Sequence, residues 1–191
     1  MKCAVIGGST LSSNISSSII QELDKVALYC ANNNIDVLTG GCAGYPLLFG
    51  KKCIEYNVRV FGYSAAKNAE EHVEIYQHPM DGCTSLLFLD SDEDNSNLRF
   101  LIRSLPLINN ADVVIALEGN WGTLFELITG VICGKKIIVW QGFGGISDDF
   151  KSIYENVSKN CKYNYGESIK YARKAEDIIM ILNSLNKDNS M

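Results

Sequence analysis

Short runs of β-branched and other apolar residues alternate with longer segments of helical periodicity along nearly all of the 191 residues. Strands that alternate with helices in this way pair in parallel, because each helix returns the chain to the start of the next strand. The runs are almost continuously apolar, as expected of strands that are covered on both faces. The pattern therefore predicts an α/β fold of Rossmann-like, doubly wound type, with a mainly parallel sheet and helices on both faces.

The individual elements follow from the same pattern. Strands are predicted at 2–6, 35–38, 59–63, 84–89, 111–117, 136–140 and 169–172. Helices are predicted at 13–32, 45–56, 98–109, 122–133, 148–159 and 175–185. The polar segment 64–82 has neither period and is predicted to be irregular. We expect one nucleotide-binding domain over residues 1–185 and a loose tail over 186–191.

Charge and composition exclude several classes of partner. The net charge of −5 is the wrong sign for a protein that neutralises nucleic-acid phosphates. Every apolar run is too short for a membrane helix. The seven cysteines form no C-x-x-C pair, which favours buried, reduced thiols in a cytoplasmic protein. His72 and His78 lack partners at metal-ligand spacing. We expect no nucleic acid, membrane, metal or cofactor.

Three glycine-bearing turns, 7–10, 39–44 and 118–123, each follow a predicted strand. Loops that follow parallel strands meet at one edge of the sheet, and the free N–H groups of a helix start favour an anion there. No turn reads G-x-G-x-x-G, so a mononucleotide or a similar small phosphorylated ligand fits better than a dinucleotide. The candidate phosphate- and nucleotide-binding residues are Gly8, Ser9, Gly40, Gly41, Gly44, Gly119, Asn120, Gly122 and Thr123.

The third turn carries a resemblance to a known family, the LONELY GUY (LOG) phosphoribohydrolases, which were long labelled lysine decarboxylases. The segment from Glu118 to Glu126 resembles the family signature P-G-G-x-G-T-x-x-E, and Arg103 falls on the family's upstream arginine. The resemblance covers nearly the whole chain. It implies hydrolysis of the N-glycosidic bond of a nucleoside 5′-monophosphate to free base and ribose 5-phosphate. It also implies that Arg103 and Glu126 are the catalytic pair.

Two positions depart from that signature and keep a second interpretation open. The family's proline is Glu118 here, and its second glycine is Asn120. A relative in the same superfamily carries molybdenum cofactor without catalysing a reaction. The alternative is therefore a non-catalytic binding or carrier protein for a nucleotide or a phosphorylated pterin. Arg103 and Glu126 favour the enzyme, whereas Glu118 and Asn120 favour the carrier.

The predicted helices 98–109 and 122–133 have more apolar residues than one sheet-facing stripe requires. We expect the surplus to form a two-fold interface between two copies of the chain, which makes the protein a homodimer, as the resemblance also implies. Arg103 would then lie near that interface. The alternative is that the C-terminal helix, 175–185, covers the surplus within one chain.

Overall fold

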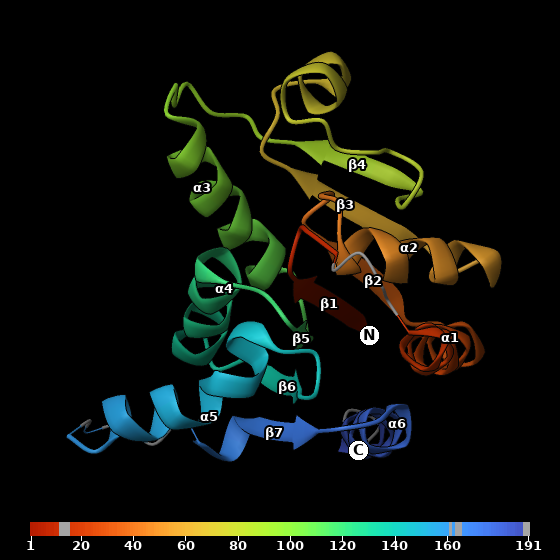
Figure 1. Ribbon diagram of the computed structural model, residues 1–191, viewed down its shortest axis with the longest axis vertical. Coiled ribbons are helices and arrows are strands. Elements are labelled where there is room, and N and C mark those ends of the chain that lie inside the picture. The colour runs from red at the N-terminus through yellow and green to blue at the C-terminus, as the bar shows by residue number, and fades with distance from the viewer. Residues whose placement is uncertain (12–15, 161, 163–165, 189–191) are drawn as a thin grey trace.

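Within residues 1–11, 16–160, 162 and 166–188, which the computed structural model describes, the chain forms a seven-stranded parallel sheet with helices on both faces. The predicted fold class, a Rossmann-like α/β protein, is confirmed (Figure 1). The strand order is β4-β3-β2-β1-β5-β6-β7. The strands are β1 (Lys2–Gly7), β2 (Asp36–Thr39), β3 (Val60–Ser64), β4 (Ser85–Phe88), β5 (Val113–Leu117), β6 (Lys136–Trp140) and β7 (Ile169–Ala172).

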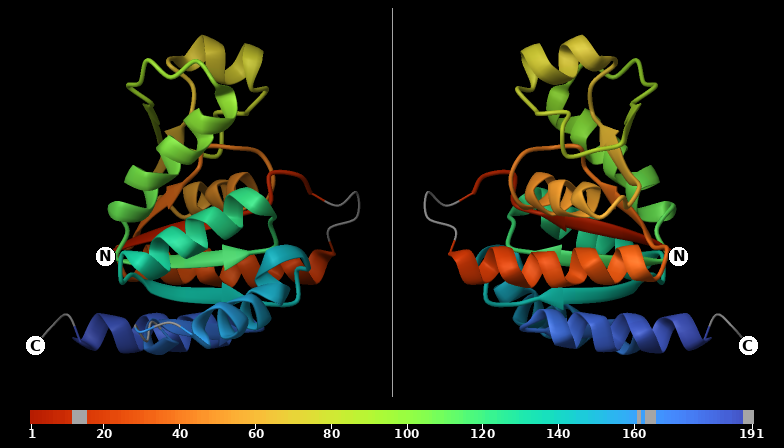
Figure 2. Two further views of the ribbon diagram at one scale, coloured as in Figure 1. Left: turned by 90° about the vertical axis from the view of Figure 1, so that its left-hand side faces the viewer. Right: turned by 90° about the vertical axis from the view of Figure 1, so that its right-hand side faces the viewer.

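Helices cover both faces of this sheet, as the two side views in Figure 2 show. One face carries α1 (Ser17–Asn32), α2 (Tyr45–Glu55) and α6 (Ala175–Asp188). The other face carries α3 (Ser96–Asn109), α4 (Trp121–Ile132) and α5 (Gly145–Ser158). Each set buries its apolar stripe against the central strands β1, β2, β5 and β6, which are almost fully buried, and this explains their continuous apolar runs in the sequence.

The strand order reverses at β1, and this reversal positions the candidate site. The chain leaves β1 toward β2, β3 and β4 on one side and returns to β5 on the other. The loops that follow two such neighbouring strands turn apart and leave a crevice between them. Gly7 at the end of β1 pairs with Leu117 at the end of β5, so the turns after these two strands lie side by side.

Helix starts differ from the prediction where a capping side chain decides them. α1 begins at Ser17, because the Ser16 hydroxyl accepts a hydrogen bond from the Ile19 N–H. The predicted start at Ser13 lies outside the described residues. α3 begins at Ser96 instead of 98, because the Asn95 side chain accepts from the first free N–H groups.

Two other helix limits differ from the prediction by three residues. α5 begins at Gly145, whereas the prediction began that helix at 148. α6 continues to Asp188, so residues 186–188 of the predicted loose tail are helical. Residues 189–191 of that tail lie outside the described residues. None of the helices in the described part of the chain has the length and apolar character that a bilayer crossing requires.

The segment 64–82, predicted to be irregular, contains a short π-helix at Glu71–Ile75. It follows β3 and forms a projecting lobe together with the edge strand β4 (Figure 1). A π-helix spaces its hydrogen bonds five residues apart, so its sequence lacks the 3.6-residue period that marks an α-helix. The periodicity in the sequence therefore gave no sign of this element.

Candidate functional site

A cleft of about 490 Å³ lies where β1, β2 and β5 end. This volume is within the usual range for sites that bind small molecules. Its walls come from the turns after β1 and β2, from α3, from the first turns of α4 and from His78 in the lobe. The crevice expected at the reversal of strand order is therefore a real cleft, and helices α3 and α4 form one side of it.

The N-terminus of α4 faces this cleft with unpaired backbone donors. Asn120 is the N-cap residue, but its side chain makes no capping hydrogen bond. The N–H of Leu124 bonds to the Asn120 carbonyl, whereas the N–H groups of residues 121–123 find no acceptor in the described part of the chain. Gly122 and Thr123 line the cleft. A row of free donors at the positive end of a helix dipole is suited to an anion.

Three polar side chains meet in the same cleft. Arg103 Nη1 donates to Glu126 Oε1 over 3.1 Å, and the Ser104 hydroxyl donates to the same oxygen over 2.8 Å. All three residues are buried. No donor among the described residues contacts Glu126 Oε2. Because Thr123 and Glu126 are three residues apart, they share one face of α4, and the carboxylate lies one turn from the free N–H groups.

Burial raises the pKa of the Glu126 carboxyl above its ordinary value, although Arg103 and Ser104 oppose the rise. The Arg103 guanidinium also lies over the Phe100 ring, with 5.8 Å from Cζ to the ring centroid. Arg103 Nε is buried and has no partner among the described residues. The guanidinium therefore holds Glu126 with one nitrogen and keeps another donor unpaired, which is the arrangement expected of a group that also binds a ligand.

The predicted binding residues divide into two groups. Ser9, Gly40, Asn120, Gly122 and Thr123 line the cleft, as do both predicted catalytic residues. The remaining predicted residues, Gly8, Gly41, Gly44 and Gly119, do not line it.

The glycines outside the cleft lining have structural reasons to be glycine. A Cβ at Gly44 would collide with the backbone of Gly8 and Ser9, and Gly44 has a φ of +81°. Gly119 has a φ of +91°, and a Cβ there would collide with the Thr123 side chain. Such backbone angles favour glycine. These residues shape the turns that surround the cleft.

Gly40 and Gly122, which both line the cleft, differ in whether a Cβ would fit. A Cβ at Gly40 would collide with the Arg103 guanidinium, so this glycine lets Arg103 approach the sheet. A Cβ at Gly122 would meet nothing within 4 Å. The fold therefore does not require a glycine at 122, and the close approach of a ligand to the α4 N-terminus would explain it.

Glu118, which replaces the proline of the LOG signature, does not line the cleft. Its carboxylate occupies the space beside Gly8, where a Cβ would collide with Oε2. Its backbone has a φ of +55°, and its N–H donates to the Ser147 hydroxyl over 2.9 Å. Its carboxylate therefore lies against the turn after β1 and is not among the groups that line the cleft.

The remaining reactive side chains are possible metal ligands and the cysteines. The described residues contain no group of three His, Cys, Asp or Glu side chains that could hold a metal. The prediction that the cysteines are buried is wrong for Cys133, which is exposed, and for Cys42 and Cys83, which are partly exposed. Burial raises the pKa of the Cys42 and Cys83 thiols. Cys161 lies outside the described residues.

Several cleft residues were not predicted from the sequence. Ser104 directly follows Arg103, and Phe100 precedes it by one helical turn, so the position of the arginine on α3 could have indicated both. His78 lies in the lobe, where the sequence has no period to show which side chains point inward. The only signal for His78 was its residue type.

The fold is a Rossmann-like fold of the nucleotide-binding type. The chain belongs to the SLOG cluster4 family, whose model matches residues 1–179. Among curated proteins, no sequence relative matches this chain.

Several solved structures share the fold. The protein TM1055 is 21% identical, with 96% of this chain and 99% of that chain covered and a TM-score of 0.70. The molybdenum cofactor binding protein of the phototrophic bacterium Rippkaea orientalis is 20% identical, with 96% of both chains covered and a TM-score of 0.67. DNA processing protein A of Helicobacter pylori, described with a single-stranded DNA binding mode, is 16% identical, with coverages of 98% and 81% and a TM-score of 0.66.

Proposed function

We propose that this protein binds a nucleoside 5′-monophosphate and hydrolyses its N-glycosidic bond, releasing the free base and ribose 5-phosphate. The observation that carries the proposal is the placement of two groups in one cleft. Free N–H groups at the α4 N-terminus lie one helical turn from the Glu126 carboxylate, which Arg103 and Ser104 hold in place. The match of Arg103 and Glu126 to the LOG signature supports the same assignment.

The chemistry assigned to Glu126 follows from how its two oxygens are used. As the bond from the sugar carbon to the base breaks, its electron pair leaves with the base nitrogen and positive charge develops on the ribose. An anionic carboxylate in a buried site stabilises that charge. Water then adds to the sugar carbon and loses a proton, while the base gains one. Oε1 is held by Arg103 and Ser104, so Oε2 remains to face the ribose and orient the water.

Incubation of the purified chain with a panel of nucleoside 5′-monophosphates tests the proposal, with chromatography to measure free base. We expect base release from at least one monophosphate and none from the matching nucleoside, because the nucleoside lacks the anion that the α4 N-terminus would hold. Absence of free base across the panel would overturn the enzymatic assignment.

A non-catalytic carrier of a nucleotide or a phosphorylated pterin is the second candidate function. The fold shared with the Rippkaea orientalis molybdenum cofactor binding protein favours it, as do Glu118 and Asn120 in the third turn. The same panel, with 6-hydroxymethylpterin phosphate included, separates the two functions when binding is measured alongside base release. Tight binding of an intact ligand without base release would identify the carrier.

We also propose that the protein is a homodimer through α3 and α4. Ile128, Ile132 and Trp121 of α4 are exposed, as are Leu98 and Leu105 of α3. Their spacing places them in one stripe on each helix. The alternative, that the C-terminal helix covers this surface, is wrong for the described residues, because α6 packs with α1 on the opposite face of the sheet.

Light scattering tests the dimer. We expect a mass of twice 21.1 kDa for the full chain, because paired α3–α4 surfaces would remove the exposed apolar residues from water. Ile128→Glu should reduce the mass to that of one chain. Met180→Glu, on the exposed side of α6, is the control and should leave it unchanged. A wild-type mass of 21.1 kDa would contradict the dimer.

A further inference from the structure

An aromatic cluster lies in the cleft on the side of Arg103. The His78 ring lies 6.2 Å from the Phe100 ring at an interplanar angle of 71°, and both side chains line the cleft. Tyr76 lies behind them, stacked on His78 at 6.2 Å and edge-on to Phe100 at 5.1 Å. The two lining rings come from different elements, the lobe and α3.

Contacts within the cleft place this cluster next to the polar centre. Phe100 lies under the Arg103 guanidinium, and Arg103 in turn holds Glu126. Glu126 is one turn along α4 from the free N–H groups. A ligand with its phosphate at those N–H groups and its ribose at Glu126 would therefore extend past Arg103 toward Phe100 and His78.

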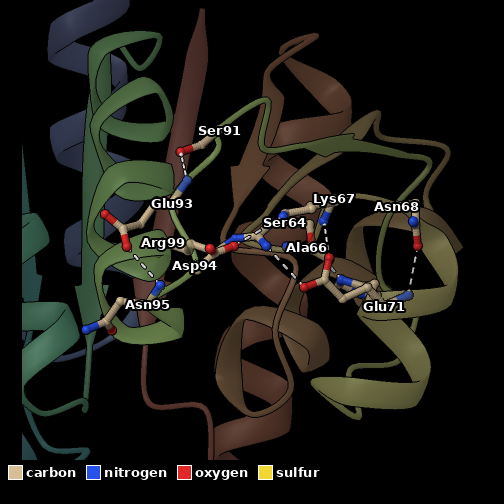
Figure 3. Close-up of polar contacts among 11 residues, drawn as sticks. Ser64, Ala66, Lys67, Asn68, Glu71, Ser91, Glu93, Asp94, Asn95 and Arg99 are labelled. Atoms are coloured by element: carbon tan, nitrogen blue, oxygen red, sulfur yellow. Dashed lines mark hydrogen bonds and ion pairs between the residues drawn. The ribbon is translucent and has the colours of Figure 1, made fainter.

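The lobe that carries His78 is joined to α3 by an ion pair between the buried Arg99 and the partly exposed Glu71 (Figure 3). Arg99 of α3 is almost completely buried, and its Nη1 donates to Glu71 Oε1 over 3.1 Å. The other Glu71 oxygen accepts from the Lys67 N–H over 2.6 Å. The His78 N–H then donates to the His72 carbonyl over 3.1 Å. These bonds fix the backbone segment that carries His78 relative to α3, which supplies Phe100.

The His78 imidazole is uncharged at neutral pH. Its pKa is lowered to about 4, first by burial and then by the nearby His72 and Arg103. Its side chain makes no hydrogen bond to the described residues, and its Nε2 is buried without a partner. An uncharged, flat surface with an unused polar nitrogen suits a neutral heterocycle better than a second phosphate.

Resting on the proposed function, we infer that His78 and Phe100 form the binding surface for a fused, nitrogen-containing bicyclic ring carried by the phosphorylated ligand. A purine nucleotide and a phosphorylated pterin both supply such a ring. The surface selects ligands by this ring, while the α4 N-terminus binds the phosphate that all of them share.

Calorimetry with AMP, 6-hydroxymethylpterin phosphate and ribose 5-phosphate tests this inference in the Glu126→Gln background, where AMP stays intact. We expect AMP or the pterin phosphate to bind at least about tenfold more tightly than ribose 5-phosphate, because ring stacking adds affinity. The tighter of the two identifies the source of the ring. His78→Ala should remove about tenfold of that ligand's affinity and leave ribose 5-phosphate binding unchanged.

Tyr76→Phe is the matched control, because Tyr76 belongs to the cluster but does not line the cleft. It should change neither affinity. The inference is overturned if neither ring-bearing ligand binds better than ribose 5-phosphate, or if His78→Ala weakens all the ligands equally. Failure of the proposed hydrolysis is a separate result, since it would show as absent base release while ring-dependent binding persists.

Discussion

Glu126→Gln is expected to lower the rate of base release by about a thousandfold or more while nucleotide affinity changes little. Glutamine keeps the size of the side chain and can still accept from Arg103 and Ser104. It lacks the negative charge that the oxocarbenium-like transition state requires. An interaction that is made only in the transition state affects turnover and not ground-state binding. The measurement is free base from the responsive monophosphate, with calorimetry for affinity.

Glu155→Gln on the exposed surface of α5 is the control for the change of charge, since Glu155 is exposed and forms an ion pair with Lys151 on the same helix over 4.0 Å. It should retain wild-type turnover. Equal turnover in Glu126→Gln and wild type would contradict the catalytic assignment of Glu126. Loss of both affinity and turnover would instead assign the carboxylate to the structure of the cleft.

Much of the fold could be predicted because it is encoded in the spacing of apolar residues along the chain and in the order of strands and helices. Strands buried on both faces produce continuous apolar runs, and a parallel sheet follows from their alternation with helices. Arg103 and Glu126 could be paired from the amino-acid sequence because the LOG signature and its upstream arginine have a set spacing. The fold brings the two side chains within 3.1 Å of each other.

Contacts between distant segments account for what the sequence did not indicate. Nothing local in Gly40 shows that its missing Cβ makes room for Arg103, and nothing local in Gly44 shows that it abuts Gly8. Both glycines stand in turns that are typical of phosphate binding. The sequence does not distinguish a glycine that makes room for a ligand from one that makes room for another part of the protein. His78 lines the cleft from a lobe that the Arg99–Glu71 ion pair joins to α3. Contacts between distant segments leave no periodic pattern and no fixed spacing in the sequence.

Glu118→Pro, which restores the residue of the LOG signature, is expected to destabilise the protein by at least about 3 kcal/mol. Proline holds φ near −65°, whereas residue 118 has a φ of +55°. Proline also lacks the N–H that Glu118 donates to Ser147. Denaturant unfolding measured by circular dichroism would give the difference in free energy of unfolding.

Glu118→Gly separates this backbone effect from loss of the carboxylate. Glycine adopts positive φ without strain, and it removes the buried Glu118 oxygen that has no partner among the described residues. Its free energy of unfolding should equal that of the wild type or exceed it by about 1 kcal/mol. Wild-type stability in Glu118→Pro would show that the turn does not need its positive φ. The expected result would show that Glu118 belongs to a turn whose backbone shape differs from that of the signature but that still directs the α4 N-terminus into the cleft. A departure from the signature at this position would then not by itself argue against anion binding.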